Sequence, residues 1–533
     1  MVIVPGRTLC VAPRHTFFYL LISGNAAPHR SQRATGQPNH HNNELSIRMN
    51  EKSIDQIIDR LFAPAADFIS AIVLFPLFTI NGVEVPFIVV WLAAGALSFT
   101  IYLKFVNLWG FRYAIDIVRG KYTHPGDPGE ITHFQALTAA LSGTVGLGNI
   151  AGVAVAISVG GPGATLWMIV FGLFGMTAKF VECALAVKYR TIHTDGSVSG
   201  GPMYYLRKGL AEKGWVRSGI VLAALFSLMA ILASFGGGNM FQVNQAVQQV
   251  VNISGGSASF FGQNTWLLGL IFALLVAAVI IGGIKSIANV TEKIVPFMCV
   301  LYIISSLVVI GTNVEQIPNA VVAILEGAVN GKAASGGLIG TLVWGLRRAT
   351  FSNEAGVGSA AIAHSAVKTS EPVTEGFVAS LEPFVDTVII CTMTALVIVI
   401  SGTYQDESIQ DGIALTSSAF ATVIDWFPYL LAIAVILFAF STLVSWSYYG
   451  LKAWTYLLGE SKAAVISYKV VYCAFVVVGA SANLASVLAF SDGVLIAMSL
   501  PNLIGCYVLI PQVKQDMQSF VSRTERGKIA AYH

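Results

Sequence analysis

The sequence predicts an all-α integral membrane protein with eleven transmembrane helices, ten of them forming an inverted repeat of five plus five. Of the 533 residues, 55% are hydrophobic and 11% are charged, and the mean hydropathy is +0.71. A soluble domain carries about 25% charged residues, so this composition excludes a soluble globular protein. Apolar runs of about 20 residues, long enough to cross a bilayer, fill most of the chain. Two of these runs are interrupted by glycines and polar residues, and the interrupted runs are five spans apart.

Charge balance and cysteine spacing argue against other classes of protein. The chain has 31 Lys and Arg against 28 Asp and Glu, a balance that does not suggest a nucleic-acid partner. The 6 cysteines show neither CxxC nor Cys/His spacing, so we expect small buried hydrophobic residues rather than a metal site. No GxSG or HExxH motif indicates a membrane-embedded protease. We therefore expect no enzyme activity.

Residues 1–48 differ in composition from the rest of the chain, because Arg, His, Asn and Pro are frequent among them. We expect an N-terminal extension with no folded role and a true start at Met49. The alternative is a signal peptide whose apolar region is the short run 16–23.

Residues 49–84 are expected to form an amphipathic segment at the membrane interface. Apolar side chains recur at helical spacing over 54–61. The apolar stretch 68–80 that follows is short and is interrupted by Pro76. We therefore expect an interfacial or re-entrant helix there rather than a full span.

The transmembrane domain is expected at 85–512 and a C-terminal tail at 513–533. Between the spans, twenty Lys and Arg fall on one side of the membrane and only Lys332 falls on the other. Because cytoplasmic loops carry the positive excess, the first span runs from outside to inside and the tail is cytoplasmic. The eleven apolar runs are 85–106, 133–158, 163–187, 218–250, 265–284, 293–313, 337–366, 377–401, 427–451, 463–482 and 484–511.

The second span is a poor helix at its middle, where residues 142–149 read SGTVGLGN. Each glycine costs about 1 kcal/mol relative to alanine in a helix. We predict a break there. The alternative is close packing of two helices, which small residues also permit in membranes.

The seventh span is interrupted at 347–358, which read RRATFSNEAGVG. Charged groups at membrane depth cost several kcal/mol unless they pair or face water. One interpretation is a structural Arg–Glu pair in which Glu354 fixes the bend. That interpretation does not compete with a binding role for Phe351, Ser352 and Asn353.

Interruptions at corresponding positions of two halves indicate a transport site. An odd offset of five spans inverts the second half relative to the first and leaves the first span as an extra helix. Free amides after Gly146 carry the positive end of a helix dipole and suit a carboxylate, whereas carbonyls near Thr350 and Phe351 suit an ammonium group. The pattern predicts a site for a small zwitterion.

Oxygen donors for a hard cation are predicted on the ninth span. Ser441, Thr442 and Ser445 lie within about one turn, and Trp446 shares the face of Thr442. The alternative is that each hydroxyl bonds only to a carbonyl of the preceding turn.

Other polar residues within the spans are predicted to be structural. Lys179 and Glu182 are three residues apart and are expected to form a local ion pair. Glu382 and Asp386 are expected to cap or brace the eighth span, and His364 to be a structural histidine.

At these residues the chain resembles the alanine or glycine:cation symporter family, the sodium:alanine symporters of bacteria and archaea. The similarity extends over about 85–512, and 145–149 also resembles the broken first core helix of the neurotransmitter:sodium symporters. The matching stretches are 144–154, 200–205, 238–242, 351–359 and 386–392. The resemblance implies the LeuT-like fold of the APC superfamily, with discontinuous first and sixth core helices.

The resemblance also implies a function and a set of site residues. We expect a symporter that imports alanine or glycine with Na+ across the cytoplasmic membrane and that has no obligate protein partner. A proton-coupled transporter of the same fold is the alternative, with Glu354 and Asp386 as titratable groups. The expected substrate-binding residues are Thr144, Gly146, Gly148, Gln242, Phe351, Asn353 and Trp446. The expected sodium-binding residues are Ser142, Val145, Ser441 and Thr442.

The sequence departs from the usual family pattern in three places. They are the N-terminal extension, the extra apolar stretch before residue 85, and the run 347–350, where the family more often has a single Arg followed by Gly.

Overall fold

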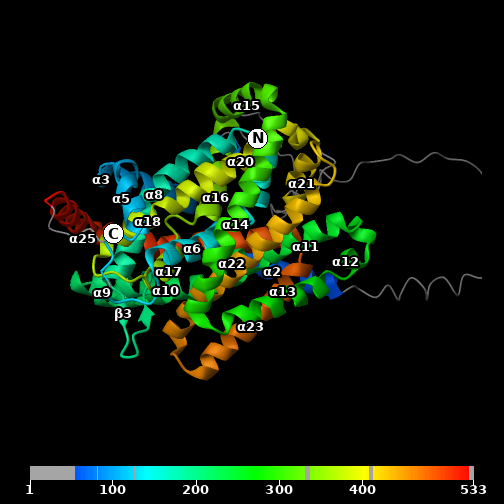
Figure 1. Ribbon diagram of the computed structural model, residues 1–533. Helices are drawn as coiled ribbons and strands as arrows, with labels where there is room; N and C mark the ends of the chain where they lie inside the picture. The colour runs from blue at the N-terminus through cyan, green and yellow to red at the C-terminus, as the bar shows by residue number, and fades with distance from the viewer. Residues whose placement is uncertain (1–53, 81, 125, 331–336, 407–411, 527–533) are drawn as a thin grey trace, which may run out of the picture. The chain divides into compact units, whose positions relative to one another are not determined.

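Helices make up nearly all the regular structure in the part of the chain described by the computed structural model (Figure 1). The structure describes residues 54–80, 82–124, 126–330, 337–406 and 412–526. The expected extension 1–48 lies outside these residues. Two short antiparallel ribbons, β1–β2 and β3–β4, depart from the all-helical expectation.

The segment before the first span is a helix followed by a hairpin. Helix α2 (Ile54–Val73) is followed by β1 (Pro76–Ile80) and β2 (Val83–Pro86), which pair antiparallel. The expectation of one helix over 68–80 is therefore wrong. The helix ends at Val73, and the chain is extended from Pro76. Helix α2 packs against α24 (Leu484–Ala497), so part of this segment covers the helical bundle.

Each expected span coincides with helical structure in the first half of the domain, and two spans are irregular at their middles. In the first, the helices on either side of 145–147 are bent by 51° relative to each other. The elements are α3 (Phe87–Tyr102), α6 (His133–Thr144), η1 (Gly148–Gly152), α7 (Val153–Gly160), α8 (Ala164–Lys188), α10 (Val216–Phe235), η2 (Gly236–Met240), α11 (Phe241–Ile253), α13 (Thr265–Ile280) and α14 (Gly283–Thr312).

The second half of the domain also contains a broken span among longer helices. Within the predicted seventh span, one helix ends at Asn353 and another begins at Ala360. The elements are α16 (Gly337–Asn353), α17 (Ala360–His364), α18 (Pro372–Ala379), α19 (Leu381–Pro383), η6 (Phe384–Cys391), α20 (Thr392–Ser401), α22 (Phe427–Leu458), α23 (Lys462–Ser481), α24 and α25 (Ser499–Glu525).

Shorter elements connect these helices. They are α4 (Val106–Trp109), α5 (Phe111–Val118), β3 (Thr191–Ile192), β4 (Val198–Ser199), α9 (Pro202–Glu212), η3 (Gly256–Ala258), α12 (Phe260–Gln263), η4 (Val314–Gln316), α15 (Ile317–Asn330), η7 (Thr403–Gln405) and α21 (Ile413–Ala421).

Among the described residues, seven helices are long and apolar enough to cross a membrane, or eight if the bent pair at the first break counts as one span. Helices α3 and α13 have 16 residues each and are about 24 Å long. The chain is a multi-pass membrane protein, while the count of eleven spans stays a prediction. Helix α25 continues through Pro511 to Glu525, so the first part of the expected tail is helical.

The two broken spans lie together inside the bundle. The first contacts the second through η1 against α16 and through α6 against α17. Helices α8 and α22 contact both. Most of α8 is buried, whereas α23 exposes much of its surface, as expected for a helix that faces lipid.

Candidate functional site

Every substrate or sodium residue predicted from the sequence is buried. The exposed fraction is 5% for Phe351, 4% for Gln242 and 1% for Trp446. These residues come from the two breaks, from α11 and from α22. A ligand can therefore reach them only when helices move apart.

The first break begins where α6 ends at Thr144. The amide of Gly146 donates to Asn149 Oδ1 at 2.9 Å, and the amide of Leu147 donates to Gln242 Oε1 at 2.9 Å. Side-chain oxygens thus accept the hydrogen bonds of the amides that the sequence predicts to bind a substrate carboxylate. The hydroxyl of Thr144 bonds back to the carbonyl of Ala140 at 3.3 Å, so it is turned toward its own helix.

The second break begins at Glu354, a non-glycine residue with a φ of 55°. This left-handed conformation costs about 1–2 kcal/mol. The carboxylate of Glu354 accepts hydrogen bonds from Trp446 Nε1, at 3.0 Å, and from the hydroxyl of Ser359. These contacts hold the strained turn against α22.

The interpretation of Glu354 as the partner of an arginine is wrong. Arg347 and Arg348 both pair with Asp492 on α24. Residue 354 lies past the end of α16, where its carboxylate accepts from Trp446 and Ser359 instead. The arginines and Glu354 consequently face different neighbours.

The two breaks meet at glycines. A Cβ added to Gly148 would lie 3.4 Å from Cδ1 of Phe351, and one added to Gly146 would lie 2.5 Å from Oγ1 of Thr442. A Cβ added to Gly238 would lie 2.1 Å from Cγ of Trp446. Gly146 and Gly238 therefore have no space for a side chain, and Gly148 lies in contact with Phe351.

Asp386 on η6 connects the two breaks, whereas the sequence predicted a capping or bracing role for it, or a titratable group in a proton-coupled transporter. Its Oδ1 accepts from Asn149 Nδ2 at 2.6 Å, and its Oδ2 accepts from the hydroxyl of Ser352 at 2.7 Å. Asn353 is turned toward the same element, where its amide donates to Thr387 Oγ1 at 2.9 Å. Asn149 and Asp386 both lie in stretches that carry the family resemblance, and this resemblance is the sequence signal that could have identified them as site residues.

The hydroxyls predicted to bind a cation divide into two groups. Thr442 Oγ1 donates to the carbonyl of Ser142 at 3.0 Å, and Ser445 Oγ donates to that of Ala139 at 3.0 Å. The alternative of a bond within the same helix is therefore wrong for these two residues. The hydroxyl of Ser441 donates to the carbonyl of Phe438 in its own helix at 3.0 Å and also lies 3.5 Å from Sδ of Met298 on α14.

The end of α6 and the middle of α22 bring oxygen atoms together. Ser142 Oγ donates to the carbonyl of Ser441 at 2.7 Å, in addition to the bond from Thr442 to the carbonyl of Ser142. Val145 lies buried one turn further along, where α6 has ended. A set of hydroxyl and carbonyl oxygens is the donor type that a hard cation prefers.

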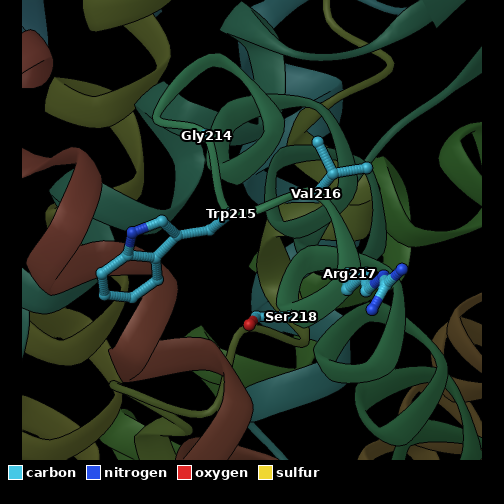
Figure 2. Close-up of a pocket in the computed structure, with 5 residues that line it drawn as sticks. All are labelled: Gly214, Trp215, Val216, Arg217 and Ser218. Atoms are coloured by element: carbon cyan, nitrogen blue, oxygen red, sulfur yellow. The ribbon is translucent and has the colours of Figure 1, made fainter.

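A surface hollow lies away from these residues. It is lined by Gly214, Trp215, Val216, Arg217 and Ser218, at the turn between α9 and α10 (Figure 2). None of the predicted site residues lines it.

Comparisons with known proteins agree with the resemblance found in the sequence. The profile of the sodium:alanine symporter family matches residues 75–533. The sodium/alanine symporter AgcS of Methanococcus maripaludis is 40% identical over 438 residues, which cover 82% of this chain and 94% of that protein. A putative sodium/proton-dependent alanine carrier protein of Bacillus subtilis, YrbD, is 33% identical, with 83% of this chain and 91% of that protein covered.

Among solved structures, the crystal structure of MhsT in complex with L-phenylalanine is similar with a TM-score of 0.50 and 16% identity. The match covers 72% of this chain and 89% of that chain. This likeness shows a shared LeuT-like fold.

Proposed function

Because the chain belongs to the sodium:alanine symporter family, we propose that it imports alanine or glycine together with Na+ by alternating access. Members of this family are transporters rather than enzymes. The proposal includes eleven spans in an inverted repeat of five plus five, an insertion in the cytoplasmic membrane and a cytoplasmic C-terminus. The cargo is one small neutral amino acid and sodium.

The observation that carries the proposal is the close packing around Gly146 and Gly148 in the first break. A Cβ at Gly146 would lie 2.5 Å from Thr442 Oγ1 and 2.8 Å from Gln242 Oε1, and one at Gly148 would lie 3.4 Å from Cδ1 of Phe351 in the second break. A site lined by bare backbone and closed by large side chains admits only a small ligand.

Gln242 has a defined role in this proposal. Its Oε1 accepts the amide of Leu147, and its Nε2 donates to the carbonyl of Gly237 at 2.8 Å. A substrate carboxylate would replace Oε1 at the amide, because that amide carries the positive end of the following helix. Gln242 then releases the amide when substrate binds, and Thr144, Asn353 and Trp446 complete the pocket.

Sodium is proposed to bind between α6 and α22. The oxygens of Ser142, Ser441 and Thr442 already converge there, with the carbonyl of Val145 at the break. An ion at this position would link the first break to α22. Substrate and sodium would then stabilise the same conformation, which is the requirement for coupled transport.

The test is uptake by the purified full chain in proteoliposomes. Radiolabelled alanine and glycine should accumulate when an inward sodium gradient is imposed and should compete with each other. Replacement of sodium by potassium should abolish accumulation. Equal uptake in the two salts would contradict the proposal.

Proton coupling is the second candidate, and it is favoured by one observation. Asp386 is a fully buried carboxylate that bonds to both breaks, which is where a coupled proton would need to act. Uptake driven by a pH gradient in the absence of sodium would support this candidate over the first.

A further inference from the structure

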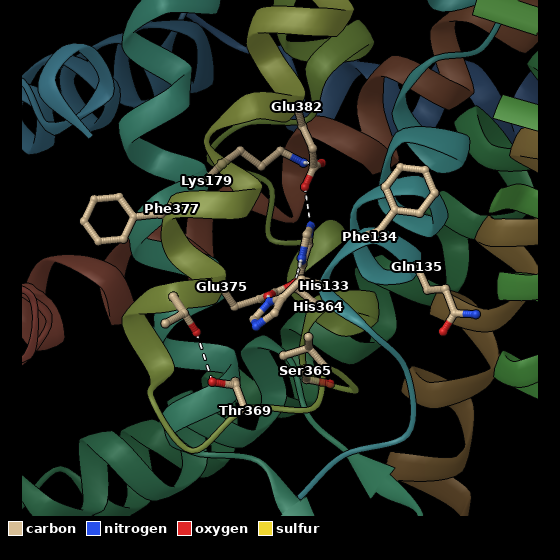
Figure 3. A network of polar contacts seen from close by, with 12 residues as sticks. His133, Phe134, Gln135, Lys179, His364, Ser365, Thr369, Glu375, Phe377 and Glu382 are labelled. Atoms are coloured by element: carbon tan, nitrogen blue, oxygen red, sulfur yellow. Dashed lines mark hydrogen bonds and ion pairs between the residues drawn. The ribbon is translucent and has the colours of Figure 1, made fainter. Parts of the chain in front are cut away.

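His364 lies between two carboxylates at the end of α17. Its Nδ1 is 2.5 Å from Glu375 Oε1, and its Nε2 contacts Glu382 Oε1 (Figure 3). The other oxygen of Glu375 is 2.5 Å from Nδ1 of His133, and the other oxygen of Glu382 accepts from Lys179 Nζ at 3.2 Å. These five side chains come from five different helices and are buried; we refer to them as the His364 network.

The contacts of His364 require one additional proton. A neutral imidazole has one N–H and can donate to one carboxylate only, whereas an ionised carboxylate can only accept. When both carboxylates are ionised, both ring nitrogens must donate and His364 is an imidazolium. Lys179 and His364 then balance Glu375 and Glu382, so these four charges sum to zero, as the high cost of buried charge favours.

His133 is the neutral member of the His364 network. Its Nδ1 donates to Glu375, while its Nε2 is buried with no hydrogen-bond partner among the described residues. A second proton on this ring would leave a buried N–H unsatisfied. The additional proton is therefore assigned to His364.

Other ionisable groups surround the network from each element that packs on it. Arg190 follows α8 and lies within electrostatic range of Glu375, and Glu354 and Glu182 lie within range of Lys179. Cys183 on α8 and Tyr449 on α22 lie within range of Glu382. None of these groups hydrogen-bonds to His364 in the part of the chain described.

The His364 network joins the same-side ends of the two broken spans. His133 is the first residue of α6, and His364 is the last of α17. The backbone ties these ends as well, since the amide of Glu130 donates to the carbonyl of Ala366 at 2.8 Å. Arg190 donates to the carbonyls of Ser365 and Thr369 at 2.8 and 2.7 Å. The ends can separate only when this connection opens.

We propose that His364, held between Glu375 and Glu382, is a proton-binding site whose proton keeps the ends of the two broken spans together. Loss of the proton to water leaves a neutral ring facing two carboxylates, so one contact breaks and the network carries a net negative charge. The ends of α6 and α17 are then free to move apart.

The variant Glu375→Gln tests the proton directly, because glutamine satisfies every contact without it. Its carbonyl oxygen can accept from His133, and its amide can donate to a neutral His364, which still donates to Glu382. The matched control is Glu182→Gln. Glu182 is a fully buried glutamate on α8 that accepts from Asn502, and among the described residues no hydrogen bond joins it to a histidine.

The first readout is the 15N NMR signal of histidine ring nitrogens in the purified full chain, with His364→Gln used to assign the signal. At about pH 8 an ordinary histidine is neutral. We expect the doubly protonated ring in the wild type and in E182Q, and a neutral ring in E375Q. A neutral His364 in the wild type overturns the proposal, whether or not any variant folds.

The second readout is uptake as a function of pH at saturating sodium. We expect wild-type and E182Q uptake to change about threefold or more across the pH at which the His364 signal titrates. Uptake by E375Q should stay flat over that range. A wild-type pH profile in E375Q overturns the gating role. This readout rests on the proposed transport function, whereas the NMR readout does not, so the two can fail separately.

Discussion

Arg348 on α16 pairs with Asp492 on α24, deep in the bundle, with 1% and 2% of their side chains exposed. Arg347 reaches the same oxygen of Asp492 at 2.9 Å. The guanidinium carbon of Arg348 also lies 5.0 Å from the ring centre of Phe351. A charged cluster therefore lies one helical turn from a predicted substrate residue.

Asp492→Asn should destabilise the protein strongly. The change leaves the buried Arg348 and the partly exposed Arg347 without a counter-charge, and breaking a buried pair costs about 3–5 kcal/mol. Thermal unfolding in detergent measures the effect. The control is Asp516→Asn, which removes the partner of Lys188 in a pair that is 30% exposed on each side and should cost less than about 1 kcal/mol. Similar losses of thermal stability in both variants would show that the burial of the Asp492 pair does not add to its contribution.

Gly146→Ala should abolish uptake while the protein still inserts. The new methyl group would lie 2.5 Å from Thr442 Oγ1 and 2.8 Å from Gln242 Oε1, and overpacking costs about 1–3 kcal/mol. Gly152→Ala is the matched control in the same motif, because its Cβ would meet only one atom, at 3.9 Å. Initial uptake rates in proteoliposomes should fall in the first variant and stay near wild type in the second.

Thr442→Val should raise the sodium concentration that gives half-maximal uptake by about tenfold, as the loss of one good oxygen ligand costs about 1–2 kcal/mol. Thr442→Ser restores the hydroxyl and should restore the sodium dependence. Ser441→Ala should have a smaller effect, because that hydroxyl bonds to its own helix. An unchanged sodium dependence in Thr442→Val would place the ion elsewhere.

Asp386→Ala should reduce uptake about tenfold or more, since it removes the acceptor for Asn149 and Ser352 and leaves buried donors unsatisfied. The maximal rate of uptake should fall because the carboxylate of Asp386 joins the two breaks, which must move together. Asp425→Ala, at an exposed position, is the control for loss of an aspartate. Full activity in Asp386→Ala would show that this connection is dispensable.

The breaks were predictable because their causes are local. Glycines at 143, 146 and 148 weaken one helix, and charge followed by glycine at 354–358 weakens another. The structure has helix ends at both places. The family was likewise predictable, since its motifs are short continuous stretches.

Long-range partners were not predictable from spacing. Lys179 is three residues from Glu182, yet its amine donates to Glu382, 203 residues away, so the predicted local pair is wrong. Glu182 instead accepts from Asn502 at 2.7 Å. A spacing rule describes one helix surface only. It carries no information on which helix packs against that surface. For the same reason, spacing did not reveal that Asp386 and His364 contact side chains of other helices.

The contact between Gly238 and Trp446 links two positions that lie 208 residues apart. A methyl group at 238 would overlap Cβ and Cγ of the tryptophan, at 2.4 and 2.1 Å, and these atoms cannot move without the helix that carries them. Any lineage that acquires a larger residue at 238 must therefore also acquire glycine at 446 or shift α22 away from η2. The two positions should co-vary among relatives, and pocket volume should evolve by paired exchange rather than by single steps.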